Sequence, residues 1–225
     1  MLNKPPKQVG SIFCLPMRKL SLILIGAGGH ARSCIDVIEQ HGKYQIAGLI
    51  GMVEEIQNKY FSYAVIATDI ELPALAKAYQ YALIAVGQIQ TPDRRIRLYQ
   101  KVTELGFQLP SIIAPTAQVS RNATIGAGTI VMHGAIVNAG ARVGCNCIIN
   151  TRAVIEHDAV VADHCHISTA AVINGAANIG EGSFIGSGSI VKEGVTIEKR
   201  GVVGMGLAVR HNQAQYARFV GGDKS

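Results

Sequence analysis

The residues best suited to acid–base chemistry are consecutive, in the segment Glu156-His157-Asp158. A histidine beside a carboxylate is a simple general base, because the acid fixes the imidazole tautomer and stabilises the imidazolium that forms. An unperturbed imidazole titrates at about pH 6.5, so such a base needs little tuning at neutral pH. The segment predicts proton abstraction by His157 with either acid as its partner. A solvated histidine on a surface is the alternative interpretation of the same residues.

A second group, His164-Cys165-His166, has the composition of a metal site. Alternate side chains of a strand point to opposite faces, so the thiol and the two imidazoles would lie on different sides. Cys147 precedes Cys165 by eighteen residues and is in phase with it. We therefore expect both thiols inside the protein, where they are inert, and we predict no metal ligands here.

A glycine-rich turn, Gly-Ala-Gly-Gly-His at residues 26–30, follows an apolar run at 20–25 and precedes helical spacing at 31–41. Strand, turn and helix in this order open a nucleotide-binding α/β unit, whose turn N–H groups and helix N-terminus favour a phosphate. Ala31 stands at the position of the third glycine of the dinucleotide fingerprint, and this short match is only a weak signal for NAD. A tight turn that binds no ligand is the alternative.

A six-residue repeat runs through the second half of the chain. Every sixth residue from Ile113 to Val209 is isoleucine or valine, and the residue two positions earlier is nearly always small. This period belongs to neither an ordinary strand nor a helix. It is typical of a hexapeptide-repeat parallel β-helix, in which three short strands form one triangular coil. The 96 residues between the two ends (209 − 113 = 96) correspond to roughly five coils.

The first half of the chain predicts a Rossmann-like α/β domain with a small parallel sheet. The expected strands lie at residues 20–25, 45–50, 63–67 and 81–86, and the expected helices at 31–41, 72–79 and 92–106. The expected divisions are a disordered leader at 1–18, the α/β domain at 19–110, the β-helix at 111–212 and a C-terminal tail at 213–225.

The composition disfavours several classes of protein. The net charge is +6, but the basic residues are scattered and aromatic residues make up only 5%, so we expect no nucleic-acid partner. A mild positive charge suits anionic small molecules such as nucleotides or coenzyme A. Five cysteines, an odd number, and no secretory signal favour the reducing cytoplasm. The apolar run at 20–25 is too short to span a membrane, so we expect no membrane partner.

The glycine-rich turn, followed by a hexapeptide region with Asn-Thr-x-x-x-Ile-Glu-His-Asp at 150–158, resembles the bacterial sugar acetyltransferases. That family includes the bacillosamine-pathway N-acetyltransferase and the sialic-acid O-acetyltransferase. The resemblance extends over about residues 19–212. It implies a left-handed parallel β-helix, a homotrimer, and acetyl-coenzyme A bound in the groove between neighbouring β-helices.

The resemblance also implies roles for individual residues. His157 matches the general base and Asp158 the acid that raises its basicity. His166 matches the residue that contacts acetyl-coenzyme A near the acetyl group, and Ser187 and Met205 match positions whose backbone holds the coenzyme. The positions that match contacts to the sugar nucleotide are Gly28, Gly29, His30, Gly87 and Asn150.

The sequence departs from the family after the second expected strand. Relatives with a uridine-nucleotide substrate carry two aspartates there, whereas this chain has Gly51 and Met52, with acids later at Glu54 and Glu55. A carboxylate pair accepts hydrogen bonds from a base or a ribose, which the side chains of Gly-Met cannot do. The sequence therefore supports acetyl transfer better than it identifies the nucleotide.

Together with these residues, the resemblance implies an acetyl-coenzyme A-dependent N-acetyltransferase of bacterial surface-glycan biosynthesis. Its substrate would be the amino group of a UDP-linked 4-amino sugar, acetylated directly in a ternary complex. An O-acetyltransferase of a sialic- or legionaminic-type sugar would use the same residues. A non-catalytic β-helix scaffold that binds a sugar nucleotide is a further alternative. So is a metal-dependent trimer of carbonic-anhydrase type, with His133, His157, His164 and His166 as ligands.

Overall fold

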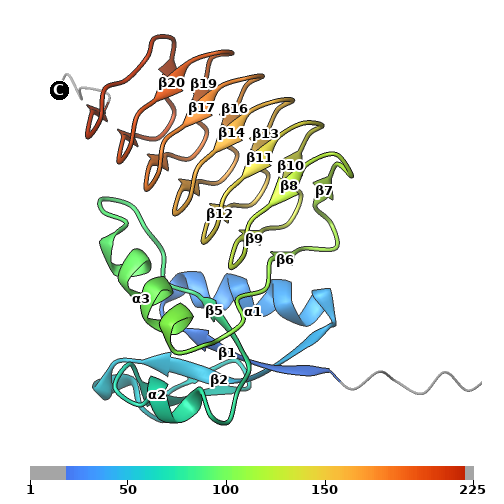
Figure 1. Ribbon diagram of the computed structural model, residues 1–225, viewed down its shortest axis with the longest axis vertical. Helices are drawn as coiled ribbons and strands as arrows, with labels where there is room; N and C mark the ends of the chain where they lie inside the picture. Colours follow the sequence, from blue (N-terminus) through green and yellow to red (C-terminus); the bar gives the residue numbers. More distant parts are fainter. Residues whose placement is uncertain (1–18, 221–225) are drawn as a thin grey trace, which may run out of the picture.

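The computed structural model describes residues 19–220, so the expected leader at 1–18 lies outside the described residues. The chain forms an α/β domain and a stack of β coils, and helix α1 (Gly29–His41) lies between the sheet of the first and the coils of the second (Figure 1). Within residues 19–220, no helix has the length and apolar character that crossing a bilayer requires.

Besides α1, the elements of the α/β domain are β1 (Leu20–Ile25), β2 (Tyr44–Gly51), η1 (Val53–Glu55), β3 (Lys59–Tyr60), β4 (Tyr63–Thr68), α2 (Leu72–Leu75), β5 (Tyr81–Ile84) and α3 (Asp93–Glu104). The strands form a five-stranded sheet in the order β3-β4-β2-β1-β5, in which only β3 is antiparallel to its neighbour. The four predicted strands and three predicted helices are present, although α2 is shorter than expected, and η1 and β3 were not predicted.

Both faces of this sheet are covered, which explains why β1 is a continuous apolar run. Leu22 and Leu24 pack with α1 on one face, while Ile23 and Ile25 pack with α2 and α3 on the other.

Three parallel sheets form the sides of the β-helix. The seven-stranded sheet contains β6 (Ile112–Ile113), β9 (Ile130–Val131), β12 (Ile148–Ile149), β15 (His166–Ile167), β18 (Phe184–Ile185), β21 (Val202–Val203) and β23 (Arg218–Phe219). The six-stranded sheet contains β7 (Gln118–Val119), β10 (Ile136–Val137), β13 (Val154–Ile155), β16 (Val172–Ile173), β19 (Ile190–Val191) and β22 (Ala208–Val209). The five-stranded sheet contains β8 (Thr124–Ile125), β11 (Arg142–Val143), β14 (Val160–Val161), β17 (Asn178–Ile179) and β20 (Thr196–Ile197).

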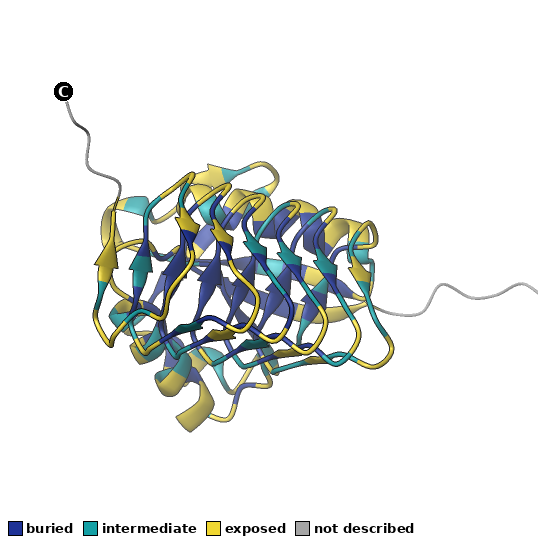
Figure 2. Cartoon of the chain, turned by 90° about the horizontal axis from the view of Figure 1, so that it is seen from above, coloured by how far each residue is buried: buried dark blue, intermediate teal, exposed yellow. Residues whose placement is uncertain are grey.

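The six-residue repeat forms the interior of this β-helix, as predicted. Each strand from β6 to β22 ends on one of the isoleucine or valine residues of the repeat, and each pairs with its equivalent in a neighbouring coil, as Ile149 does with Ile167. Cys147 and Cys165 are fully buried in the small positions between them. Figure 2 shows that dark blue, buried segments recur from coil to coil along the β-helix.

Strand pairing continues past residue 212, where we expected the β-helix to end. Gln213 bridges to Ile197, and β23 pairs in parallel with β21. The first part of the expected tail therefore adds to the stack, and only residues 221–225 lie outside the described part of the chain.

The two domains share one apolar core. Ile112, Ile130 and Ile148 point outward from the seven-stranded sheet and pack with Ile35 and Ile38 of α1. The α/β domain therefore covers this side of the β-helix and fixes the glycine-rich turn relative to the coils.

Candidate active site

His157 lies at the corner between β13 and β14, and its side chain is 67% exposed. Its Nδ1 is 3.0 Å from Oδ2 of Asp158. Because a carboxylate only accepts hydrogen bonds, Nδ1–H is the donor and Nε2 keeps a free lone pair. This arrangement suits a general base that receives a proton on Nε2.

Glu156 is engaged elsewhere. Its Oε2 accepts hydrogen bonds from Nδ2 of Asn138 at 2.9 Å and from the backbone N–H of His157 at 3.4 Å. Of the two acids beside His157, Asp158 is therefore the one that contacts the ring, a choice that the sequence left open.

Two glycines from neighbouring coils make room for this pair. A Cβ on Gly175 would lie 2.6 Å from Nε2 of His157, and a Cβ on Gly140 would collide with the carboxylate of Asp158. Asp158 has a φ of +59°, in the left-handed region that few non-glycine residues adopt. Its backbone N–H donates to the carbonyl of Ala139 at 3.1 Å, which ties this turn to the preceding coil.

His166 faces out of the β-helix but is covered by the α/β domain and is only 7% exposed. Its Nδ1–H donates to the carbonyl of Gln88 at 2.6 Å, and Nδ2 of Asn150 donates to its Nε2 at 3.2 Å. The pKa of His166 is lowered to about 4, mainly by burial; the hydrogen bond to Gln88 opposes this shift, and the charge of Arg95 contributes to it. His166 is therefore a neutral hydrogen-bonding group at neutral pH.

His30, in the first turn of α1, lies beside His166, with 6.5 Å between the ring centroids. Burial, then the charges of Arg95 and His166, lower the pKa of His30 to about 3. Gly87 is next to it, since a Cβ there would lie 3.7 Å from the Cβ of His30. The junction of the two domains thus brings His30, Gly87 and His166 together.

A pocket of about 320 Å³ lies over the glycine-rich turn. Gly28 is the N-cap of α1 and no side chain caps this helix, so its first N–H groups are available to an anion. A Cβ on Gly28 or Gly29 would meet no atom within 4 Å, so the space above the turn is open. The pocket is lined by Gly26, Ala27, Gly28, Gly29, His30, Met52, Glu55, Ala85, Val86, Gly87 and Arg94.

Glu55 and Arg94 are residues of this pocket that the sequence did not assign to it. Glu55 ends η1, and its Oε2 accepts the backbone N–H of Met52 at 2.8 Å. The carboxylate fills the space of the side chain that Gly51 lacks, because a Cβ there would lie 2.8 Å from Oε2. The carboxylate of Glu55 thus lies at the end of β2, although the residues directly after this strand are not acidic. A glutamate three residues after a helix N-cap was the signal that predicts this contact.

The two residues expected to hold the coenzyme lie on another corner, between the seven- and six-stranded sheets. The carbonyl of Ser187 accepts the N–H of Gly206 at 2.9 Å, and Met205 is 80% exposed. Asn150 belongs to the same corner, whereas His157 lies between the six- and five-stranded sheets. A single chain therefore does not bring His157 together with Ser187 and Met205.

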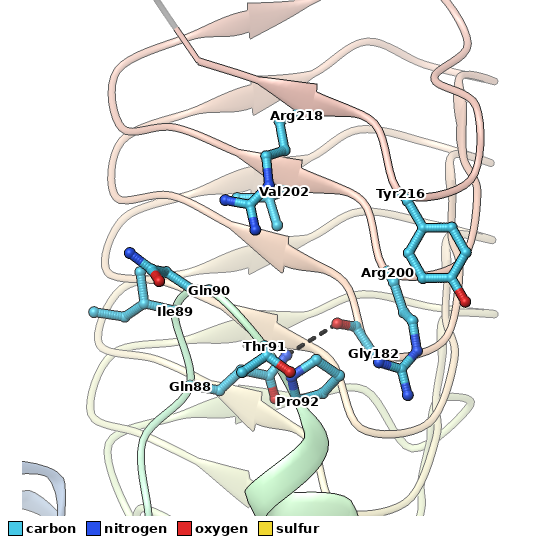
Figure 3. Close-up of a pocket in the computed structure, with 10 residues that line it drawn as sticks. All are labelled: Gln88, Ile89, Gln90, Thr91, Pro92, Gly182, Arg200, Val202, Tyr216 and Arg218. Carbon is cyan, nitrogen blue, oxygen red and sulfur yellow. Dashed lines mark hydrogen bonds between the residues drawn. The ribbon is translucent and has the colours of Figure 1, made fainter.

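Residues 88–92, in the connection between β5 and α3, line a hollow of about 200 Å³ against the coils of the β-helix (Figure 3). Nε2 of Gln88 donates to the carbonyl of Gly182 at 3.1 Å, and Nη1 of Arg200 donates to Oδ1 of Asp93 at 2.7 Å. These contacts fix the segment after β5 against the coils that carry His166.

A buried arginine also joins the domains. Arg95 is 1% exposed, and its Nη1 donates to the carbonyls of Ile84 and Val86 at the end of β5. Its Nη2 donates to the carbonyl and to Oδ1 of Asn146 at 2.9 and 2.8 Å, and Nδ2 of Asn146 is 3.0 Å from Nδ1 of His164. Arg95 thus ties the strand beside the pocket to a coil of the β-helix.

The histidines of the metal alternative lie in different places. His133 contacts Oδ2 of Asp36 at 2.9 Å, His164 faces Asn146, and His157 lies at its own corner. In the part of the chain that the structure describes, no group of three histidine, cysteine or acidic side chains is arranged to hold a metal ion.

The similarity of this chain to known proteins extends over both of its domains. The family described as PglD N-terminal domain matches residues 21–102. PerB from Caulobacter crescentus, solved in complex with CoA and GDP-perosamine, is 31% identical over 89% of this chain and 94% of its own, with a TM-score of 0.84. The acetyltransferase domain of PglB from Neisseria gonorrhoeae, solved with acetyl coenzyme A, is 29% identical over 91% and 97%, with a TM-score of 0.83. A search of curated proteins gave no match.

A variant of perosamine N-acetyltransferase from Caulobacter crescentus is 30% identical over 89% of this chain and 93% of its own, with a TM-score of 0.84. The fold is the expected one, a Rossmann-like α/β domain followed by a left-handed parallel β-helix. The chain belongs to the bacterial sugar acetyltransferases, and it is an acetyltransferase.

Proposed function

We propose that the protein transfers an acetyl group from acetyl-coenzyme A to the amino group of a nucleotide-linked amino sugar, with His157 as the general base. The observation that carries this proposal is the contact between His157 Nδ1 and Asp158, which leaves Nε2 free on an exposed corner. Similar proteins have been solved with CoA and GDP-perosamine or with acetyl coenzyme A.

The amine nitrogen attacks the thioester carbonyl, and Nε2 of His157 takes the proton that the nitrogen loses. Asp158 stabilises the resulting imidazolium through the hydrogen bond to Nδ1. When the tetrahedral intermediate collapses, the C–S bond breaks, the amide remains, and the imidazolium returns the proton to the thiolate of coenzyme A. General-base catalysis of this kind contributes roughly 10²–10⁴-fold to the rate.

His166 is a poor donor to the oxyanion of this intermediate. Its Nδ1–H is used by the carbonyl of Gln88, and its Nε2 accepts from Asn150. Asn150 is the better candidate, since its amide has a second N–H. In this proposal His166 orients Asn150, and the backbone around Ser187 and Met205 holds the coenzyme.

The active enzyme is a homotrimer in this proposal. The six-stranded sheet carries an apolar stripe on its outer face, formed by Ile136, Val154, Val172, Ile190 and Ala208. Ile190 is 47% exposed, and apolar surface of this kind favours burial against another copy. The stripe lies between the corner of His157 and the corner of Ser187, so a neighbouring chain seated on it would adjoin both corners.

The substrate nucleotide binds over the glycine-rich turn. Its diphosphate would accept hydrogen bonds from the uncapped N-terminus of α1 at Gly28, Gly29 and His30, with Gly87 alongside. A uridine nucleotide was expected from the sequence, whereas PerB was solved with a guanosine nucleotide. The diphosphates of uridine and guanosine nucleotides are the same, so a turn that contacts only the phosphates accepts either nucleotide.

Thiol release from acetyl-coenzyme A tests this function. The acceptors are GDP- and UDP-linked 4-amino-6-deoxy sugars, a CMP-linked nonulosonic acid and free amino sugars. Release with an amino-sugar nucleotide should fall roughly 10²–10⁴-fold in His157→Ala. His211→Ala removes another exposed histidine and should keep the wild-type rate.

A His157→Ala rate within about threefold of wild type would contradict the role of His157. Release only with the nonulosonic acid would instead identify an O-acetyltransferase. Absence of both thiol release and coenzyme binding would support the scaffold alternative.

A further inference from the structure

The pocket over the glycine-rich turn holds one carboxylate and one guanidinium, which come from distant parts of the chain. Glu55 is at the end of η1, and Arg94 is in the first turn of α3. Met52 contacts both, since its backbone N–H donates to Glu55 and its Sδ is 3.7 Å from Nη2 of Arg94. Met52 therefore lies between the carboxylate, which its backbone contacts, and the guanidinium, which its side chain contacts.

Glu55 has unused capacity to accept hydrogen bonds. An ionised carboxylate offers about four lone-pair sites. Oε2 receives the N–H of Met52 at 2.8 Å, and Oε1 receives the hydroxyl of Tyr60 at 3.3 Å. About one site on each oxygen thus remains for two neighbouring donors of a ligand.

We propose that Glu55 and Arg94 select a guanine base, so that the acceptor is a GDP-linked amino sugar; this rests on the function proposed above. Guanine presents two adjacent donors, N1–H and the 2-amino group, which match the two free sites of Glu55. Its O6 and N7 are neighbouring acceptors that suit an arginine. The thioether of Met52 supplies an apolar, polarisable surface for the ring.

The other bases match this pair less well. Uracil has a single N–H between two carbonyl oxygens, which a carboxylate repels. Adenine and cytosine each offer one amino group beside an unprotonated ring nitrogen, so only one oxygen of Glu55 would be satisfied. Gly51 is also needed for this recognition of guanine, because any side chain there would displace the carboxylate of Glu55.

Calorimetric titration of the full chain with GDP, IDP and UDP tests the proposal without acetyl transfer. A hydrogen bond to a charged group is worth about 1.5–3 kcal/mol, so GDP should bind about 10- to 100-fold more tightly than UDP. IDP, which lacks the 2-amino group, should bind between the two. Glu55→Gln should reduce the ratio of GDP to IDP affinity toward one, and Glu54→Gln, the matched control on η1, should leave it unchanged.

Arg94→Gln should weaken binding of GDP more than of UDP, and Arg97→Gln on the same helix should weaken neither. Because each ratio is measured within one variant, a loss of folded protein does not alter it. Equal affinity for GDP and UDP in the wild type would overturn the proposal. So would a large preference for GDP over 2′-deoxy-GDP that Glu55→Gln abolishes, because Glu55 would then contact the ribose.

These outcomes are separable from failure of the proposed function. Tight GDP binding without thiol release from any acceptor would contradict acetyl transfer alone. Thiol release with a UDP-linked amine, together with equal GDP and UDP affinities, would contradict the base preference alone.

Discussion

The imidazole of His157 lies against Gly175 of the next coil, so close that a Cβ there would be 2.6 Å from Nε2. Real Cβ atoms do not approach other atoms so closely, so the glycine is what allows the ring to hold this position. Nε2 of His157, the nitrogen of the proposed base, thus lies over the backbone of Gly175 with no side chain between them.

Gly175→Ala should therefore lower kcat by displacing the ring of His157. We expect a loss of about 10- to 100-fold, because misplacement of a catalytic group by about 1 Å costs up to roughly that factor. The affinity for coenzyme A should change little. Steady-state kinetics and a thermal melt would separate this effect from loss of folded protein, and an unchanged kcat would show that the ring has room to move.

Asp158→Asn should reduce the rate by removing the negative charge beside Nδ1–H of His157. An amide in this place accepts as well as donates, and it does not stabilise an imidazolium. We expect kcat to fall roughly 10- to 100-fold, less than in His157→Ala. Glu156→Gln is the matched control, since Glu156 contacts Asn138 and not the ring. A larger loss in Glu156→Gln would reverse the assignment of the two acids.

The buried imidazole of His166 should make the protein less stable in mild acid. Its pKa is lowered from 6.5 to about 4 by burial, so below pH 6.5 the unfolded chain binds a proton that the folded chain does not. Stability is therefore greatest above pH 6.5 and is lost as the pH falls toward 4, by on the order of 3 kcal/mol. The lowered pKa of His30 acts in the same direction.

Urea unfolding between pH 7 and pH 4.5 measures this effect. His166→Asn should be less stable overall but should lose less stability between the two pH values. His211→Asn, which replaces an exposed histidine, should keep the wild-type slope. An unchanged slope in His166→Asn would mean that other groups cause the acid sensitivity.

The β-helix was predictable because its signal is local and repeated. One inward isoleucine or valine in every six residues defines each strand, and the structure has them all in phase from β6 to β22. A contact between His157 and an adjacent acid was also predictable, but the sequence did not decide between Glu156 and Asp158, because both are adjacent to the histidine.

Contacts between segments that are far apart in the sequence produce no such repeated pattern of residue types. His133 had no acidic neighbour in the sequence, yet it contacts Asp36, 97 residues away. His166 was expected on an outer face of the β-helix, which is correct, but its burial depends on the α/β domain that covers that face. Glu55 was missed because a turn of η1, rather than the end of the strand, delivers its carboxylate.

Arg95→Lys should destabilise the junction of the domains. Burial lowers the pKa of Arg95 to about 10, so the group remains charged at neutral pH, and it donates to Ile84, Val86 and Asn146 together. A lysine has one nitrogen and cannot reach both sides, which leaves buried carbonyls without donors. We expect a loss of roughly 2–4 kcal/mol in the free energy of unfolding, measured by urea denaturation. Arg97→Lys, on the exposed side of α3, should change it little.

Ile190→Asp should dissociate the proposed trimer. Ile190 is the most exposed large residue of the apolar stripe, and a carboxylate buried there would have no partner of opposite charge from the stripe itself. Sedimentation velocity should show a shift from trimer to monomer, and thiol release should fall with it, since one chain does not hold His157 and Ser187 at the same corner.

Thr196→Asp is the control on the five-stranded sheet, where the same charge should leave both the assembly and the activity unchanged. If the wild type sediments as a monomer and still releases thiol, the composite site between chains is wrong. If Ile190→Asp remains a trimer, the chains associate through a different side of the β-helix, because an unpaired carboxylate would not be tolerated within a packed apolar interface.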